Sequence, residues 1–515
     1  MFERVLVANR GEIAVRIIRA VHELGAEAVA VYSEADRGAL HVRLADAAVL
    51  IGPPPAAQSY LDIPAVLDAA RRSKAQAIHP GYGFLSENAH FALACEEAGL
   101  VFVGPTPEAL GLMGDKVAAR RLAAAAGVPT VPGTADPLTD DASALAAGAM
   151  IGFPLLVKAA GGGGGKGMRA VRDPADLAAA VAQARREAGA AFGDASVYLE
   201  RLVERPRHIE VQLFGDGSGR VVALGERECS IQRRFQKVVE EAPAPHLPPH
   251  LRQALWGAAT AVAAGVKYRG AGTAEFLYDP AAGAFYFLEM NARLQVEHPV
   301  TEMVTGIDLV KAQLRLAAGA DLEDALGASI SHTEVPHLLV LDEAASTGIH
   351  ALHAIEARIM AEDPANGWLP STGTLEVVRE PGGLGVRVDS ACEPGLEVTV
   401  DYDPLLAKLI VWGTSRREAI DRLRCAVDEY VVTGVRTTLP FHRWIARDSA
   451  FCAADLSTAF IAERWGPFID GDAAPWAAGP LRAAALVAVE RVAMQARRAA
   501  VQGSDRGTRG TGGAG

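Results

Sequence analysis

The segment "GTAEFLYDPAAGAFYFLEMNARLQVEHPVTE", residues 272–302, decides how the chain folds around a dense row of polar residues. Two strand-like runs, 272–278 and 284–291, flank turn residues at Asp279-Pro280 and Gly283, which predicts a β-hairpin. From residue 287 onward, polar and apolar residues alternate, as they do along a half-buried strand. The polar positions of this alternation are Glu289, Asn291, Arg293, Gln295 and Glu297. We therefore predict one strand through residue 297, with an apolar face and a face of acids, amides and a guanidinium.

The hairpin brings two acids together. If it is centred near Ala282, Glu275 lies opposite Glu289, with the Cβ atoms about 5 Å apart. Two carboxylates at that distance repel each other and should raise each other's proton affinity unless a cation lies between them. Asn291 adds a further oxygen, and this ligand set suits Mg²⁺ or Mn²⁺. The alternative is a hairpin face on which the acids and the arginine meet only water.

A run of five glycines, Gly161 to Gly165, joins two strand-like segments and is bracketed by Lys158 and Lys166. Without side chains, the amides of such a loop can approach phosphate oxygens closely, and the lysines supply positive charge. The run is not a P-loop, because Gly167 follows the lysine where Ser or Thr is required. It predicts a lid over phosphates, and the alternative is a floppy surface loop.

The rest of the chain divides into four regions. Residues 1–113 alternate strand and helix patterns, which predicts a doubly wound parallel sheet (α/β), although "NRGEIA" after the first strand lacks the dinucleotide fingerprint. Residues 114–330 form an α+β domain, and residues 350–465 a mixed α+β domain. Residues 466–515 form a tail with one helix and a Gly-rich, disordered end. We expect an extra loop or hairpin near residues 328–352.

Composition limits the possible functions and compartments. The formal net charge of −12 disfavours a dedicated nucleic-acid binder. Apolar runs are interrupted before the roughly 18 residues that a membrane span needs, and a strand near the start leaves no room for a signal peptide. The five cysteines are widely spaced, without a CxxC pair, which argues against disulfides or a zinc site. We expect a cytoplasmic protein that binds neither nucleic acid nor membrane.

Eight segments, taken together and in this order, resemble the biotin carboxylase family of the ATP-grasp superfamily. They are "ANRGEIAVRIIRA", "HPGYGFLSEN", "MGDK", "KAAGGGGGKGM", "RHIEVQ", "ECSIQRRFQKVVEEAPAP", "RGAGTAEFLY" and "EMNARLQVEHPVTE". The resemblance covers residues 1–465 and implies that the central domain is an ATP-grasp domain with a glycine-rich lid. It also implies a reaction, the ATP-dependent carboxylation of biotin by bicarbonate through carboxyphosphate, as the first half-reaction of an acyl-CoA carboxylase in fatty acid biosynthesis.

The resemblance implies a role for each matching residue. The ATP-binding residues would be Lys116, Lys158, Gly164, Gly165, Glu200, Arg201, Leu202, Val203 and His208. The ligands of two Mg²⁺ or Mn²⁺ ions would be Glu275, Glu289 and Asn291. The bicarbonate site would consist of Lys237, Arg293, Gln295 and the backbone of Val296. The biotin site would consist of Tyr82, Gly83 and Arg358. The catalytic residues would be Lys237, Arg293, Glu297 and Arg358, with Glu297 as the base for bicarbonate and Arg358 stabilising charge on biotin.

The sequence departs from the family pattern in three places. Phe235 stands where the family commonly has His, so stacking would replace a hydrogen bond, and Arg201 replaces a common lysine. The biotin attachment signature is missing, since "VAMQAR" near Met494 has no lysine. Biotin would therefore arrive on a separate carboxyl-carrier protein, and a separate carboxyltransferase subunit would use it. The resemblance also implies a homodimer through the helix that carries Arg19 and Glu23, which stand four residues apart and could be only a surface pair.

Two other functions stay open. One is a different ATP-grasp ligase, which would form an acyl phosphate for attack by an amine. The expected pairing of Glu297 with Arg293, and "HPGYGF", favour the carboxylase. The other is a non-enzymatic nucleotide-binding module, which the intact row of acids and bases disfavours.

Overall fold

The computed structural model describes residues 1–134, 136–138, 140–159, 168–192, 195–332, 339–341 and 352–469. The predictions for the glycine run, including Gly164 and Gly165, and for the tail from residue 470 lie outside the described residues. Within the described part of the chain, no helix is both long and apolar enough to span a bilayer.

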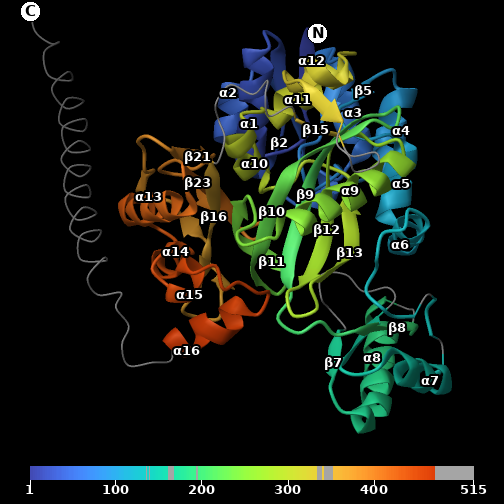
Figure 1. The fold of residues 1–515 in the computed structure, drawn as a ribbon. Coiled ribbons are helices and arrows are strands. Elements are labelled where there is room, and N and C mark those ends of the chain that lie inside the picture. Colours follow the sequence, from blue (N-terminus) through green and yellow to red (C-terminus); the bar gives the residue numbers. More distant parts are fainter. Residues whose placement is uncertain are drawn as a thin grey trace, which may run out of the picture.

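The N-terminal region is a five-stranded parallel sheet in the order β3-β2-β1-β4-β5 (Figure 1). Its strands are β1 Arg4–Val7, β2 Glu27–Ser33, β3 Ala47–Gly52, β4 Ala77–His79 and β5 Val101–Phe102. Its helices are α1 Gly11–Glu23, α2 Leu40–Leu44, α3 Ile63–Ser73, α4 Ala89–Glu97 and α5 Pro107–Gly114. Leu6 of β1 packs into one core with α3 and α4, whereas Val5 and Val7 pack into another with α1. Helices thus cover both faces, and the predicted doubly wound sheet is confirmed.

A small lobe follows, with its own three-stranded antiparallel sheet in the order β7-β6-β8. Its elements are α6 Lys116–Ala125, α7 Asp141–Ile151, β6 Leu155–Ala159, β7 Arg169–Val171, α8 Leu177–Phe192 and β8 Val197–Arg201. Val157, Val181 and Leu199 are fully buried in a separate hydrophobic core formed by residues of this lobe. Figure 1 shows the lobe projecting from one end of the large sheet. Strand β6 ends at Ala159, and the glycine run begins two residues later in the sequence.

Among the described residues, the largest sheet has ten strands and runs from the centre of the chain into its C-terminal region. Eight strands follow the order β13-β12-β9-β10-β11-β16-β23-β21, and β14 and β15 attach beside β10. Their bounds are β9 Arg207–Asp216, β10 Val221–Arg233, β11 Gln236–Ala242, β12 Arg269–Asp279, β13 Ala284–Asn291, β14 Ile330–His332, β15 Leu339–Leu341, β16 His353–Met360, β21 Val386–Ser390 and β23 Leu405–Gly413. Because β11 pairs with β16, side chains from distant parts of the sequence lie on one surface.

Helices and short strand pairs complete the fold. The helices are α9 Pro249–Gly265, α10 His298–Thr305, α11 Leu309–Ala317, α12 Leu322–Leu326, α13 Arg416–Glu429, α14 Leu439–Ile445, α15 Ser449–Cys452 and α16 Gly466–Ile469. The short pairs are β17 Glu362–Asp363 with β18 Leu369–Pro370, β19 Gly373–Thr374 with β22 Glu397–Val398, and β20 Val378–Arg379 with β24 Val431–Val432. Glu23 of α1 forms an ion pair with Lys311 of α11.

The predicted hairpin is confirmed, and its register places Glu275 opposite Glu289. The prediction of one strand through residue 297 is wrong, because β13 ends at Asn291 and α10 begins at His298. Pro299 lies in the first turn of α10, where its missing N–H costs nothing, whereas it would interrupt a strand ladder. Burial follows the alternation as far as Leu294, with half-buried Arg293 beside it, and then changes phase, because Gln295 and Glu297 are buried whereas Val296 is half-buried.

The connection near residues 328–352 contains the expected hairpin, since β14 pairs antiparallel with β15. Strand β15 also pairs in parallel with β10, through Val222 and Leu339. Residues 342–351 lie outside the described part.

Candidate active site

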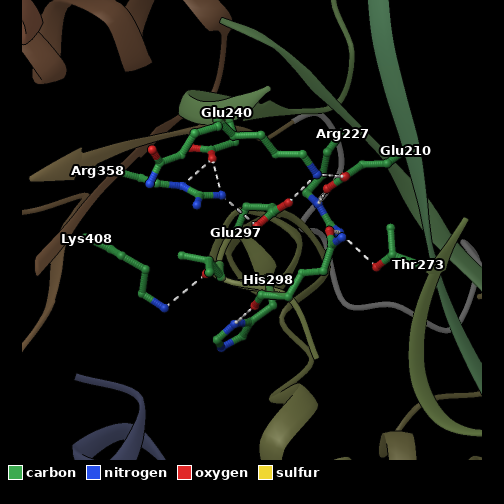
Figure 2. Close-up of polar contacts among 12 residues, drawn as sticks. Glu210, Arg227, Glu240, Thr273, Glu297, His298, Arg358 and Lys408 are labelled. Carbon is green, nitrogen blue, oxygen red and sulfur yellow. Dashed lines mark hydrogen bonds and ion pairs between the residues drawn. The ribbon is translucent and has the colours of Figure 1, made fainter. Parts of the chain in front are cut away.

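Polar side chains form a row across four neighbouring strands. The strand register aligns Glu289 with Glu275, Glu275 with Glu210, and Glu210 with Arg227. Arg227 is fully buried, and its Nε donates a hydrogen bond to Glu210 Oε1 at 2.5 Å. Its guanidinium also donates to Thr273 at 3.1 Å, as Figure 2 shows. The acids expected from the hairpin thus continue into β9 and end at a buried arginine.

Lys237 of β11 lies at the centre of three acids. Its Nζ donates to Glu275 at 2.9 Å and to Glu297 at 2.6 Å, and it also contacts Glu210. Burial lowers the pKa of Lys237, but the three carboxylates outweigh burial and hold that pKa well above its usual value. One ammonium therefore joins the expected metal ligand Glu275 to the expected base Glu297.

The charge state of Glu275 differs from the expectation. Burial on its own raises the pKa of Glu275, but Lys237 and His208 outweigh it and hold this pKa well below its usual value. His208 Nε2 lies 3.1 Å from Glu275 Oε2. The expectation that opposed acids raise each other's proton affinity is wrong for Glu275, because two basic side chains already supply the compensating charge.

Glu297 lies between two cations at the start of α10. Its Oε1 accepts from Lys237, and its Oε2 accepts from Arg358 Nη2 at 2.8 Å. Burial raises the pKa of Glu297, but Lys237 and Arg358 lower it further than burial raises it. Glu297 is therefore a carboxylate at neutral pH, able to accept a proton.

Within the described part of the chain, Arg293 makes no hydrogen bond to its expected partner Glu297. Burial lowers the pKa of Arg293, but the charges of Glu87 and Glu297 outweigh burial and raise it. Arg293 Nε donates to Glu87 Oε2 at 2.9 Å, and Glu87 Oε1 accepts from the Ala292 amide at 3.1 Å. Arg293 Nη2 also donates to Asn291 Oδ1 at 3.2 Å. The reason is the end of the strand at Asn291, which turns Arg293 toward the N-terminal region.

The neighbouring amides and carbonyls hold the same cluster together. Gln295 Nε2 and Asn291 Nδ2 donate to Glu275 Oε1 at 3.0 and 2.8 Å. The Val296 carbonyl accepts from Lys408 Nζ at 3.0 Å. Lys408 is fully buried on β23, opposite Arg358 in the register. The site therefore draws on β9 to β13, α10, β16 and β23.

Oxygen donors suit a divalent cation at one end of this row. Glu275 and Glu289 lie opposite each other, and Asn291 contributes an amide. Carboxylate and amide oxygens are ligands that Mg²⁺ and Mn²⁺ prefer. A second group of ligand atoms, from His208, Glu210 and Glu275, lies within 4.8 Å of one another. The residues present thus fit the expected metal.

The expected nucleotide residues lie partly in the small lobe. Glu200 on β8 accepts from Arg120 Nη1 at 2.6 Å and also contacts Lys158 of β6. Lys116 is the first residue of α6, and its side chain lies outside the described atoms. The backbone amides of Arg201 and Leu202 donate to Pro132 and Pro154 at 2.8 and 2.9 Å, and Val203 is buried.

The expected biotin residues Tyr82 and Gly83 lie in the loop after β4. Lys408 Nζ lies 5.7 Å from the centre of the Tyr82 ring. The Tyr82 hydroxyl is buried and has no hydrogen-bond partner within the described part of the chain. Phe235 lies in the turn between β10 and β11, with 58% of its surface exposed and a φ of +66°. That position leaves the ring open to solvent.

Sequence reasoning missed five residues of this cluster, namely Glu87, Glu210, Arg227, Glu240 and Lys408. Two signals were present. "HIEVQ" has polar residues at every second position, as the hairpin does, and Lys408 interrupts the apolar run "LLAKLIVW". Neither signal tells which strands are neighbours.

Three family models match successive parts of the chain. "Biotin carboxylase, N-terminal domain" matches residues 1–110, "Carbamoyl-phosphate synthase L chain, ATP binding domain" residues 115–325, and "Biotin carboxylase C-terminal domain" residues 356–463. A biotin carboxylase from Pseudomonas aeruginosa is 50% identical over 467 residues, which cover 90% of this chain and 99% of the relative.

Solved structures agree with these matches. A biotin carboxylase–β-γ-ATP complex from Campylobacter jejuni is 42% identical, with a TM-score of 0.81 over 90% of this chain and 99% of that chain. The biotin carboxylase domain dimer of a 2-oxoglutarate carboxylase from Hydrogenobacter thermophilus, in complex with MgADP, ADP and bicarbonate, is 44% identical. Its TM-score is 0.81 over 92% of this chain and 99% of that chain. Because the biotin carboxylase from Pseudomonas aeruginosa is 50% identical over nearly its whole length, the chain belongs to the biotin carboxylase family.

Proposed function

We propose that this chain catalyses the ATP-dependent carboxylation of biotin by bicarbonate, through carboxyphosphate. The observation that carries the proposal is the position of Lys237, which hydrogen-bonds both Glu275 and Glu297. This lysine links Glu275, an acid suited to binding the metal ion that neutralises phosphate, with Glu297, an acid suited to deprotonating bicarbonate. The complex of the Hydrogenobacter thermophilus relative with MgADP and bicarbonate supports the same pair of ligands here.

ATP would bind between the small lobe and the large sheet. We assign its phosphates to Lys116, Lys158 and the glycine lid with Gly164 and Gly165, and its adenine to the hinge at residues 200–203, with His208 beside the nucleotide. Glu275, Glu289 and Asn291 would hold Mg²⁺ or Mn²⁺, in two ions. Such a cation neutralises phosphate oxygens and so lowers the barrier to attack on the γ-phosphate.

Bicarbonate would bind beside Lys237, with Arg293, Gln295 and the Val296 backbone completing its site. Lys237 now divides its charge among three carboxylates, and bicarbonate oxygens would take part of it. The pKa of Glu297 would then rise from its lowered value, because its stabilising cation is shared. Glu297 thereby becomes the better base, and the deprotonated bicarbonate oxygen attacks the γ-phosphorus to give carboxyphosphate and ADP.

Biotin would bind near Tyr82, Gly83 and Arg358. Carboxyphosphate releases CO₂ and phosphate, the phosphate takes the N1′ proton of biotin, and the enolate attacks CO₂. Arg358 is the group that we assign to the developing enolate charge, because a planar guanidinium can donate two hydrogen bonds to it. Water must be excluded during these steps, since it would hydrolyse carboxyphosphate.

We extend the proposal to the assembly. A separate carrier protein would bring biotin, and a separate carboxyltransferase subunit, that of an acyl-CoA carboxylase in fatty acid biosynthesis, would use the product. The dimer of the Hydrogenobacter thermophilus relative supports a homodimer. We also retain 1–113, 114–330, 350–465 and 466–515 as the functional division of the chain, and the cytoplasm as its compartment, supported by the wide spacing of the cysteines.

The test uses the full chain with Mg-ATP, bicarbonate and free biotin. We expect release of ADP that depends on bicarbonate and is accompanied by carboxybiotin. Acetyl-CoA added to this mixture should remain uncarboxylated, because its acceptor site is assigned to another subunit. ADP release with no carboxybiotin in the complete mixture would contradict the proposal.

A further inference from the structure

The side chain of Glu240 lies behind Arg358 and points at it from the neighbouring strand. Glu240 on β11 is fully buried, and its Oε1 accepts from Arg358 Nε at 2.6 Å. The same guanidinium donates through Nη2 to Glu297 at 2.8 Å. Figure 2 shows Arg358 held between these two carboxylates.

This carboxylate is costly to the fold. Its second oxygen, Oε2, is buried and has no hydrogen-bond partner among the described residues. Glu356 lies opposite Glu240 in the β11–β16 register, and both of its oxygens are likewise buried and unpartnered in that part of the chain. Buried polar atoms without partners destabilise a protein, and a pair of acids facing each other adds repulsion. Within the described part of the chain, the hydrogen-bonded ion pair with Arg358 is the contact of Glu240 that offsets this cost.

We propose that Glu240 is a positioning residue that keeps the Arg358 guanidinium aimed into the site throughout the reaction. The inference rests on the proposed function. When Glu297 takes the proton of bicarbonate it becomes neutral, and its ion pair with Arg358 weakens. Arg358 then needs a second carboxylate to stay in place for the step on biotin, and Glu240 provides it from the opposite side.

The charges around Glu240 set the pH range in which this hold exists. The groups that face it or its neighbour Glu356 are Arg358 and Glu356 on β16, Glu297 at the start of α10, Lys237 on β11, Cys229 on β10 and Lys408 on β23. Burial raises the pKa of Glu240 to about 7, against the lowering effect of Arg358. Above that pH Glu240 is thus charged and its ion pair with Arg358 is complete, whereas protonation of Glu240 at lower pH removes the ion pair.

The test compares the parent, Glu240→Gln and Glu240→Asp in the full chain, with free biotin, Mg-ATP and bicarbonate, between about pH 6 and pH 8.5. Glutamine has the shape of the protonated acid, so kcat for carboxybiotin should fall by about 10- to 100-fold at the alkaline end, as expected for a misplaced catalytic group. The KM for ATP should stay unchanged. The difference from the parent should shrink as the pH falls below about 7, because the parent then loses the same charge. Glu240→Asp keeps the charge and should recover part of the rate and the pH dependence.

Glu241→Gln is the matched control. Glu241 is the next residue on β11, also buried, and it binds Arg416 and His353, away from Arg358. The Glu241→Gln substitution should lower the melting temperature but leave the shape of the pH profile of kcat as in the parent. A parent that forms no carboxybiotin contradicts the proposed function. If the parent is active, two results overturn this inference alone. One is a Glu240→Gln rate equal to the parent rate at high pH, and the other is a ratio of the two rates that stays constant at every pH.

Discussion

Lys237→Met should destabilise the centre of the large sheet measurably. The substitution removes one buried ammonium and leaves Glu210, Glu275 and Glu297 within one cluster. Removing one partner of a buried ion pair generally costs about 3–5 kcal/mol. Each acid keeps a second basic partner. These are Arg227 at 2.5 Å from Glu210, His208 at 3.1 Å from Glu275 and Arg358 at 2.8 Å from Glu297. We therefore expect the free energy of unfolding to fall by about 3 kcal/mol, the lower end of this range.

The pH dependence of this loss follows from the lowered pKa values. In the parent, ionised Glu275 and Glu297 stabilise the fold above the ordinary glutamate value of 4.5, and this stabilisation is lost as the pH falls through their lowered pKa values. In the variant, burial is no longer opposed by the ammonium, so these acids take up protons nearer neutrality. The difference in unfolding free energy should therefore be larger at about pH 8 than at about pH 5.

Urea denaturation of parent and variant at both pH values measures this difference. Lys311→Met is the control, because Lys311 pairs with the exposed Glu23, and an exposed pair should contribute less than about 1 kcal/mol. Equal unfolding free energies for parent and Lys237→Met at the higher pH, or a difference that grows at the lower pH, would refute the electrostatic account of the cluster.

Three further predictions test separate parts of the site. Glu289→Gln should lower ATP turnover and change its dependence on Mg²⁺ concentration, because a metal ligand is lost, with little loss of fold. A Mg²⁺ titration that matches the parent would count against Glu289 as a metal ligand. Arg293→Ala should keep Mg²⁺-dependent nucleotide binding, measured by calorimetry, and abolish carboxybiotin formation; loss of nucleotide binding would point to a structural role instead. A chain ending at residue 470 should carboxylate free biotin at the parent rate in the same assay, because the residues placed in the site, of which Lys408 is the last in the sequence, all precede residue 470. A folded but inactive truncation would disprove this.

The hairpin shows what local sequence can predict. Turn residues at Asp279 and Gly283 predict that the two strands pair, and the predicted opposition of Glu275 and Glu289 is present. The turn alone does not set this pair, because the register shifts by one residue between Phe276 and Glu275. The end of β13 did not follow, because the polar–apolar alternation continues past Asn291 in the sequence, whereas the burial of these residues changes phase at Gln295. Burial depends on what packs against a segment, which a periodic pattern does not contain.

The contacts of the site show what local sequence cannot predict. Arg358 meets Glu240 only because β16 pairs with β11, across 118 residues of chain. Arg293 binds Glu87 of the N-terminal region across 206 residues. The resemblance named the residues of the site, but their partners, and therefore their pKa directions, depend on strand order and register.

Transfer of labelled oxygen tests the central claim most directly. If bicarbonate attacks the γ-phosphorus of ATP, the attacking oxygen stays on phosphorus when carboxyphosphate releases CO₂. With ¹⁸O-labelled bicarbonate, Mg-ATP and biotin, mass spectrometry of the released phosphate should therefore find one ¹⁸O atom for each carboxybiotin formed. Phosphate without ¹⁸O, in a reaction that still forms ADP, would show that water is the attacking group and would contradict the account.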